Sequence, residues 1–294
     1  MLALVTGGAG VVGKALCREL LQRGVCVRVL TLPGDALAST LPSDVEVFYG
    51  DVTDPASLVP AFKGVDVVYH LAAILLSTRE GTFDRINAGG TRNVVDAAIS
   101  AGVKRFLYVS SISVTYPVLT EYGSSKLKGE SLVKRAGEEH GLSWTIVRPT
   151  LVIGDGGGIE YKMYADYVKR FPLYFLPGGG KSLKKPVRSV DLVKGIAAAG
   201  LSEKAVGKTY ALAGSRAISM ADMAKYILKK SHKKNVMVPL PWWISRKLAV
   251  LKNWIGGRTV SAEQALAGFL YDAVPSIDEA SQDLDYRPLS PFDN

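Results

Sequence analysis

A tyrosine and a lysine, Tyr122 and Lys126, lie four residues apart in a segment that favours a helix, and a serine-rich segment precedes them. Side chains at positions i and i+4 share one helix face, so the ammonium group would favour the ionised tyrosine and lower its pKa from about 10. A serine hydroxyl nearby would polarise and orient a substrate oxygen. The three groups predict proton transfer to or from a carbonyl or a secondary alcohol.

A glycine-rich loop, Gly7-Gly8-Ala9-Gly10-Val11-Val12-Gly13, lies between an apolar strand predicted at 2–6 and a helix predicted at 13–23. Small residues let the backbone approach a pyrophosphate, and the first helical turn offers unpaired N–H groups and a partial positive charge. This context predicts a dinucleotide site, formed by Gly7, Gly10, Val11, Val12 and Gly13. A dinucleotide beside a proton-transferring tyrosine implies hydride transfer.

Alternating strands and helices must position these residues. Continuously apolar strands are predicted at 2–6, 25–30, 45–49, 65–71, 106–110 and 144–147. Helices are predicted at 13–23, from Pro55 with Asp54 as its cap, at 87–100 and at 122–140. Apolar strands separated by helices are typical of a parallel sheet covered on both faces. The fold class is therefore α/β, a doubly wound parallel sheet of the Rossmann type.

The pattern changes after Pro149. We expect loops at 154–158 and 178–180 with an aromatic-rich stretch between them, helices at 190–201 and 220–230, a strand at 209–212, and an irregular chain from 239. Residues 1–150 would form the dinucleotide-binding domain, to which elements from about 187–213 are added. Residues 151–186 and 214–294 would form a smaller C-terminal substrate-binding region.

The end of the second strand normally selects the cofactor, through an acid that holds a ribose hydroxyl or an arginine that holds a 2′-phosphate. Here Thr31 lies at that end and is expected to contact the cofactor. Asp35 comes late in the following loop and Arg28 lies inside the strand. Both NAD and NADP therefore remain open.

Further short motifs follow one another along nearly the whole chain. They are Gly50-Asp51-Val52, His70-Leu71-Ala72-Ala73, Asn87-Ala88-Gly89-Gly90-Thr91-Arg92-Asn93, Ser110-Ser111, Arg148-Pro149-Thr150, residues 187–191 and Asp285-Tyr286-Arg287-Pro288. With the glycine loop and the Tyr122/Lys126 pair, this order resembles the extended short-chain dehydrogenase/reductase family, also called the NAD-dependent epimerase/dehydratase family.

The resemblance implies several cofactor contacts beyond the glycine loop. Asp51 and Val52 would contact the adenine, and Lys126 would also hold the nicotinamide ribose beside Tyr122. The remaining implied positions are Leu71, Ala72 and Ala73 in the cofactor cleft, Asn87 near the site, and Pro149 and Val152 near the nicotinamide. Ordinary packing of residues 71–73 and capping by Asn87 are the alternative interpretations.

Ser111 is the predicted third catalytic residue, because related reductases carry their serine or threonine there, and Ser110 and Ser113 are the alternatives. Only 11 residues separate Ser111 from Tyr122. Sugar-nucleotide epimerases and dehydratases of the family usually have a longer loop, so this connection is more similar to that of ordinary short-chain reductases. Ile112 and Ser113 provide no acid pair, so dehydration is not expected.

Two substrate classes remain open. Lys181, Lys185 and Arg188 would clamp the diphosphate of a nucleoside-diphosphate sugar, or would form a solvated basic loop. The aromatic residues between 161 and 175 and the stretch 239–254 would instead line a pocket for a bulky hydrophobic alcohol, as in the 3β-hydroxysteroid dehydrogenase branch. Equally, they would be core or lid residues.

The stretch 242–255 is also amphipathic, with three tryptophans and leucines interleaved with Arg246, Lys247 and Lys252. We expect this segment to cap the substrate pocket or to form an oligomer contact, such as a homodimer interface. We do not expect it to bind a membrane.

Composition excludes several other classes. The net charge of +9 comes without a nucleic-acid-binding motif, so the expected partner is a small molecule. No apolar run is long enough to span a membrane and no signal peptide is recognised. Cys17 and Cys26 are expected to be reduced core thiols of a cytoplasmic protein. The three histidines lack metal-ligand spacing, so no metal is expected.

The sequence thus predicts an NAD(P)-dependent oxidoreductase or epimerase, with Tyr122 as general acid/base, Lys126 tuning it and Ser111 orienting the substrate. A nucleoside-diphosphate sugar is the expected substrate. The alternatives are a reductase of a bulky hydrophobic alcohol or ketone, similar to 3β-hydroxysteroid dehydrogenases, and a dinucleotide-binding sensor or scaffold without catalysis.

Overall fold

The computed structural model describes residues 1–77, 79–154, 158–255 and 262–292. Its centre is a seven-stranded sheet in which every neighbouring pair is parallel. In spatial order the strands are β11 (Lys208–Leu212), β6 (Ser143–Pro149), β5 (Arg105–Val109), β4 (Val67–His70), β1 (Leu2–Thr6), β2 (Cys26–Thr31) and β3 (Val45–Tyr49). The strand order reverses between β1 and β4, which is where ligands bind in such sheets.

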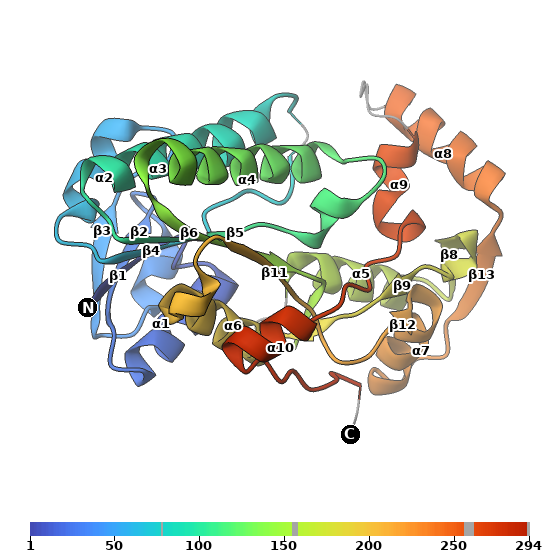
Figure 1. Ribbon diagram of the computed structural model, residues 1–294. Helices are drawn as coiled ribbons and strands as arrows, with labels where there is room; N and C mark the ends of the chain where they lie inside the picture. The colour runs from blue at the N-terminus through green and yellow to red at the C-terminus, as the bar shows by residue number, and fades with distance from the viewer. Residues whose placement is uncertain (78, 155–157, 256–261, 293–294) are drawn as a thin grey trace.

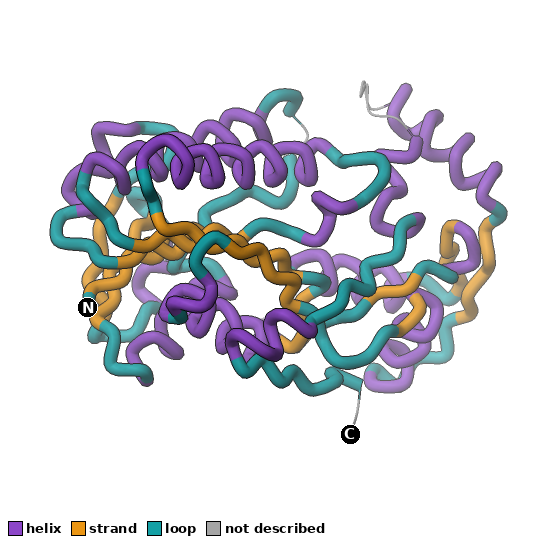
Figure 2. The backbone as a smooth tube through the Cα atoms, viewed as in Figure 1, coloured by secondary structure: helices purple, strands orange, loops and turns teal. Residues whose placement is uncertain are grey.

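Helices cover both faces of this sheet, as Figures 1 and 2 show. The helices of one face are α1 (Val11–Gln22), α6 (Ser189–Leu201) and α10 (Asp278–Leu284), and those of the other are α2 (Pro55–Phe62), α3 (Gly90–Ser100) and α4 (Glu121–His140). Leu16, Leu20 and Ile196 are fully buried on the first face, and Leu58 and Val133 on the second. The predicted doubly wound α/β fold is confirmed.

The C-terminal region packs around a third core of its own, with Tyr164, Val168, Leu176 and Met223 at its centre. Its elements are β7 (Val152–Ile153), α5 (Ile159–Arg170), β8 (Leu173–Pro177), β9 (Leu183–Lys184), β10 (Val187–Arg188), β12 (Ile218–Ser219), α7 (Met220–Lys230), β13 (Val236–Leu240), α8 (Trp242–Ile255) and α9 (Ala262–Leu270). The strands pair as β10–β7, β12–β9 and β13–β8.

One expectation for this half of the chain is wrong. The chain after residue 239 is not irregular, because α8, α9 and α10 follow one another there. Pro241 directly precedes α8, at a position where a helix tolerates proline. Because proline usually interrupts helices, the sequence did not predict that a helix begins there. The aromatic-rich stretch between the two predicted loops is a helix and a strand, α5 and β8.

The predicted loop at 154–158 includes residues 155–157, which lie outside the described residues, as do the side chains of 249–265 in the amphipathic stretch. Cys17 is buried as expected, but Cys26 is exposed at the start of β2, so its assignment to the core is wrong. In the part of the chain that the structure describes, no helix has the length and apolarity needed to cross a bilayer.

Candidate active site

The glycine loop is shaped by close backbone approaches. Gly7 has a φ of +70°, in the left-handed region, and a Cβ there would lie 2.9 Å from the backbone nitrogen of Ala72. A Cβ on Gly13 would lie 2.3 Å from the carbonyl oxygen of Gly7. The loop therefore tolerates only glycine at both positions. Helix α1 then starts with Gly10 as its N-cap, and no side chain in the described ranges caps it.

This arrangement fits a pyrophosphate. The first-turn N–H groups of Val11, Val12 and Gly13 lie at a helix N-terminus, where backbone donors and the helix dipole favour a negative charge. The missing side chains at Gly7 and Gly13 leave the backbone accessible. These residues would hold the diphosphate of a dinucleotide.

The loop after β3 contains Asp51 and Val52, the two residues predicted to contact the adenine. Asp51 accepts a hydrogen bond from the backbone nitrogen of Thr53 at 2.8 Å through only one carboxylate oxygen, Oδ1. Val52 is buried, and a Cβ on Gly90 would lie 2.7 Å from its Cγ2, so α3 is packed tightly against it. Asp51 thus presents a polar side chain held by the Thr53 backbone, and Val52 an apolar side chain held by packing against α3.

An acid does stand at the end of β2, although the sequence placed it late in the loop. The Thr31 hydroxyl donates to Asp35 Oδ2 at 2.6 Å, and the backbone nitrogen of Leu37 donates to Oδ1 at 2.9 Å. The Thr31 bond is the main cause of the lowered pKa of Asp35. A carboxylate is therefore held beside Thr31, where the ribose of a dinucleotide is selected.

Tyr122 and Ser111 meet at the carboxyl edge of the sheet. Ser111 follows β5, and Tyr122 lies in the first turn of α4, which Thr120 caps by accepting a hydrogen bond from Gly123 at 2.9 Å. Burial raises the pKa of Tyr122, the charge of Glu160 raises it further, and a hydrogen bond with Ser111 opposes the rise. Burial outweighs the effect expected of Lys126, and Tyr122 is protonated at neutral pH.

The two alternative serines have other partners. Ser110 is buried and donates to Glu130 at 2.6 Å, and the Ser113 hydroxyl donates to Ser111 at 2.9 Å. Ser111 is thus the serine that interacts with Tyr122.

Lys126 is buried, with its Nζ 4.2 Å from the centre of the Tyr108 ring. Burial lowers its pKa to about 7, and the charge of Glu130 opposes that shift. Glu130 lies one turn further along α4 and is held by Arg148 with contacts of 2.6 and 2.8 Å. The sequence analysis missed Glu130, although its spacing of four residues from Lys126 was a signal.

A buried polar chain connects β1 to the catalytic helix. The Thr6 hydroxyl lies 2.6 Å from His70 Nδ1, and His70 Nε2 lies 3.0 Å from the Thr91 hydroxyl. Thr91 donates to the carbonyl of Asn87 at 2.6 Å, and Asn87 Nδ2 donates to Ser125 Oγ at 3.0 Å. Burial lowers the pKa of His70 to about 3, so its imidazole is neutral.

Asn87 does not cap a helix. It lies fully buried in a π-helical turn (Asp84–Gly89) before α3, where its amide also pairs with both backbone groups of Ile74. Asn87 thereby fixes the loop after β4, which contains Leu71, Ala72 and Ala73, against α4. Pro149 ends β6 and Val152 starts β7, at the same edge of the sheet.

The predicted phosphate clamp does not form a free group of cations. Arg188 makes two contacts with the Asp191 carboxylate at 2.7 and 2.9 Å, and the Lys185 ammonium donates to the Pro275 carbonyl at 3.3 Å. Lys181 is exposed.

Sequence reasoning missed a charged pair on the substrate side. Lys184 is 5% exposed, donates to the Tyr271 carbonyl and lies 5.5 Å from the centre of the Tyr116 ring. Burial lowers its pKa to about 8, opposed by Asp272 and Glu160. Glu160, in the first turn of α5, is exposed, yet the surrounding protein raises its pKa, while Lys184 opposes the rise.

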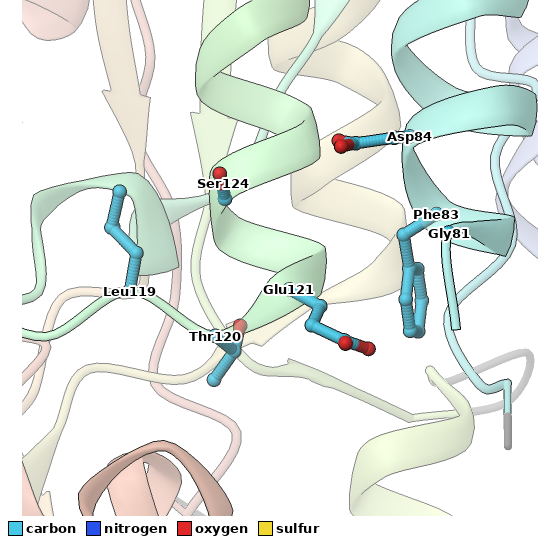
Figure 3. Close-up of a pocket in the computed structure, with 7 residues that line it drawn as sticks. All are labelled: Gly81, Phe83, Asp84, Leu119, Thr120, Glu121 and Ser124. Atoms are coloured by element: carbon cyan, nitrogen blue, oxygen red, sulfur yellow. The ribbon is translucent and has the colours of Figure 1, made fainter. Parts of the chain in front are cut away.

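A pocket of about 310 Å³ lies between the start of α4 and the segment that precedes α3 (Figure 3). Its residues are Gly81, Phe83, Asp84, Leu119, Thr120, Glu121 and Ser124. The Glu121 side chain points toward the Phe83 ring, and that ring meets Tyr122 edge-on at 6.2 Å. Two carboxylates, Asp84 and Glu121, make this pocket unfavourable for a phosphate.

Within the described residues, no group of three or more histidine, cysteine, aspartate or glutamate side chains could hold a metal ion.

The chain is similar to several known proteins. A 3β-hydroxysteroid dehydrogenase/Δ5→4-isomerase of Mycobacterium tuberculosis is 30% identical over 322 residues, covering 97% of this chain and 86% of the relative. A ceramide reductase of Caulobacter vibrioides is 36% identical over 152 residues, or 52% of this chain and 46% of the relative.

Among solved structures, the UDP-glucuronic acid 4-epimerase of Bacillus cereus, determined with UDP-glucuronic acid and NAD, superimposes with a TM-score of 0.76. It is 23% identical, and the match covers 99% of this chain and 95% of that one, which shows a common fold. The model of the NAD dependent epimerase/dehydratase family matches residues 3–213. The motifs, the fold and this match agree, and the chain belongs to the NAD-dependent epimerase/dehydratase family.

Proposed function

We propose that this chain is an NAD(P)-dependent oxidoreductase that moves hydride between the dinucleotide and a hydrophobic secondary alcohol or ketone. The observation that carries the proposal is that Ser111, which follows β5, interacts with Tyr122 in the first turn of α4, and that Lys126 lies one turn further along the same helix. The glycine loop that would hold the dinucleotide follows β1 of the same parallel sheet. A sensor or scaffold has no need for a half-buried tyrosine beside a serine, with a lysine on the next helical turn.

Each of the three residues has a distinct role in this proposal. A bound nicotinamide supplies or accepts the hydride. The Tyr122 hydroxyl gives a proton to the carbonyl oxygen in reduction and accepts one from the alcohol in oxidation. The Ser111 hydroxyl hydrogen-bonds to the same oxygen and fixes its position. Lys126, on the next turn, holds the nicotinamide ribose and, when protonated, favours the tyrosinate.

The protonation state of Tyr122 in this structure is the one that reduction uses. Burial and the charge of Glu160 raise the pKa of Tyr122, so the hydroxyl is protonated at neutral pH and ready to donate. Oxidation needs the tyrosinate and therefore gains from a rise in pH.

The substrate we propose is the sequence-based alternative, a hydrophobic alcohol or ketone, in place of a nucleoside-diphosphate sugar. Arg188 is already paired with Asp191, and Lys185 donates a hydrogen bond to the Pro275 carbonyl. These two cations would therefore contribute little to the binding of a diphosphate. Glu160 adds a negative charge that acts on Tyr122 itself. The steroid dehydrogenase and the ceramide reductase that resemble this chain are named for hydrophobic substrates.

A sugar nucleotide remains the second candidate because of Lys184. This buried cation lies beside Tyr116, which is in the segment between Ser111 and Tyr122. An ammonium group there would contact one phosphate of a diphosphate. The solved structures of similar fold include an epimerase with a sugar nucleotide bound.

One panel assay separates these functions. Dinucleotide absorbance is followed with NAD and NADP for long-chain secondary alcohols, 3β-hydroxysteroids and UDP-sugars, and with NADH and NADPH for the matching ketones. UDP-sugar epimers are resolved by chromatography. We expect turnover of the hydrophobic compounds and none of the UDP-sugars. Turnover of UDP-sugars alone would overturn the substrate class.

Tyr122→Phe tests the catalytic role itself. We expect it to lower kcat by about 10²- to 10⁴-fold, the usual contribution of a general acid, with dinucleotide affinity retained. Full turnover in this variant would refute the role of Tyr122, and a wild-type chain that binds dinucleotide but converts no compound of the panel would favour the sensor.

A further inference from the structure

An apolar stripe runs along the exposed side of α5. Ile159, Met163 and Tyr167 follow one another at four-residue spacing and are 41%, 50% and 38% exposed. Tyr164 and Val168, on the opposite side of the same helix, are buried in the core of the C-terminal region. Residues at i, i+4 and i+8 share a helix face, so the three apolar side chains form one row, with the exposed charged residues Asp166 and Arg170 beside it.

The stripe continues onto the neighbouring strands. The Tyr167 hydroxyl donates to the carbonyl of Phe175 at 2.7 Å and accepts from its backbone nitrogen at 3.0 Å. Phe175 and Leu173 alternate with buried residues on β8 and are 47% and 54% exposed. Val236 of β13 pairs with Leu173 and is 57% exposed. In Figure 1, α5 lies between the central sheet and the β8–β13 pair at the far end of the molecule.

One end of the stripe lies at the active site. Gly158, directly before Ile159, donates a backbone hydrogen bond to the carbonyl of Val152 at 3.1 Å, and Val152 starts β7 at the edge of the sheet where Ser111 and Tyr122 lie. The charge of Glu160, which follows Ile159, also acts on Tyr122 and Tyr116. Contiguous exposed apolar surface is uncommon on a soluble domain and marks a binding region. Here it leads away from the catalytic tyrosine.

The length of the stripe is that of an extended chain. The eight-residue step from Ile159 to Tyr167 is about 12 Å long in a helix. The two-residue step from Phe175 to Leu173 adds about 7 Å in a strand. A sugar ring is too short and too polar to bury apolar surface along the row of side chains. A hydrocarbon chain would bury apolar surface along all of it.

We propose that this surface, here named the α5–β8 track and defined as Ile159, Met163, Tyr167, Leu173, Phe175 and Val236, binds the hydrocarbon part of a long-chain alcohol or ketone, and that Glu160 and Lys184 flank its polar end. A hydroxyl or amide satisfies both charged groups, since it donates to the carboxylate and accepts from the ammonium. A phosphate would be repelled by Glu160. The inference rests on the proposed function and specifies the substrate class of that same site.

A bilayer surface is the other occupant that an exposed apolar stripe suggests. Membrane binding gives no reason for the stripe to start at the catalytic tyrosine, whereas a substrate tail requires that continuity. The track is therefore assigned to the substrate.

The test compares Met163→Gln and Leu173→Gln with the matched control Leu289→Gln, whose leucine is 59% exposed outside the track. In wild type, kcat/KM for methyl ketones should rise by up to about fourfold for each added methylene, the value of one buried CH₂ group. Both track variants should flatten this dependence, and the control should keep it. A wild-type slope near zero, or unchanged slopes in both track variants, would overturn the track.

A binding measurement makes the test independent of turnover. A pyrene-labelled decanol is titrated into the protein in the presence of NAD or NADP. Each track variant should weaken binding about tenfold, and the control should not. If no ketone or alcohol is converted, the proposed function fails, and this titration still decides the track. If the probe binds equally to all variants, the track fails although the oxidoreductase stands.

A third measurement addresses the bilayer. The same variants are sedimented with phosphatidylglycerol vesicles. Loss of vesicle binding in the track variants, together with unchanged binding of the pyrene-labelled decanol, would show a membrane-docking surface and would overturn the proposal. Weakened probe binding without any change in sedimentation would support it.

Discussion

His70 makes the stability of this fold depend on pH in a predictable window. Its pKa falls from 6.5 in the unfolded chain to about 3 in the folded one, because the ring is fully buried and Lys126 lies near it. The unfolded chain therefore binds the additional proton, so stability is present above pH 6.5 and is lost as the pH falls toward about 3. Between about pH 7 and pH 5, this linkage removes about 2 kcal/mol from the free energy of unfolding.

The matching change in melting temperature is measurable. For a chain of 294 residues, the unfolding entropy is about 0.6 kcal/mol/K, so 2 kcal/mol corresponds to about 3 °C. We expect His70→Gln, which removes the titrating ring, to lose about 3 °C less than wild type between pH 7 and pH 5 in calorimetry. His140→Gln, a control at an exposed histidine, should keep the full wild-type loss. An equal loss in wild type and His70→Gln would refute the buried neutral histidine.

Three further changes test the site. Gly13→Ala would place a Cβ 2.3 Å from the Gly7 carbonyl, so dinucleotide affinity measured by calorimetry should fall at least about tenfold, whereas Gly89→Ala, with its nearest neighbour at 3.6 Å, should keep it. Asp35→Asn removes a carboxylate at the end of β2, so the ratio of kcat/KM with NADP to that with NAD should rise about tenfold, and an unchanged ratio would exclude Asp35 from cofactor selection. Ser111→Ala should lower kcat by about 10²- to 10³-fold with unchanged dinucleotide affinity, and a loss confined to affinity would contradict its role toward the substrate oxygen.

The first half of this fold could be predicted because its signals are local. Strands such as β1 are continuous apolar runs, and the turn at Gly7 needs a residue without a side chain, so a few neighbouring residues suffice. The ends of elements were less predictable. Asn87 was placed in a regular helix, whereas it lies in a π-helical turn whose geometry depends on the contact with Ser125, 38 residues away.

The substrate side could not be predicted in this way, because its residues come from separate segments. Lys184 is one of several lysines in a basic stretch, and only its burial against Tyr116 and Tyr271 distinguishes it. The significance of Glu160 depends on its reach to Tyr122, which lies on another element. The spacing of residues along the chain predicts neither the burial of Lys184 nor the effect of Glu160 on Tyr122.

The net positive charge of the chain also shows that residue counts alone do not predict the substrate. A surplus of nine positive charges suggests an anionic ligand when residues are only counted. In the fold, Arg28 donates hydrogen bonds to two backbone carbonyls and to Glu46. Arg148 donates to the Glu130 carboxylate, and Arg188 donates to the Asp191 carboxylate. These guanidinium groups stabilise the protein itself, and their charge is not offered to a ligand. On the substrate side, the charge of Glu160 acts on Tyr122 and the Lys184 ammonium lies over the Tyr116 ring. This mixture of charges would match a neutral polar group better than a diphosphate.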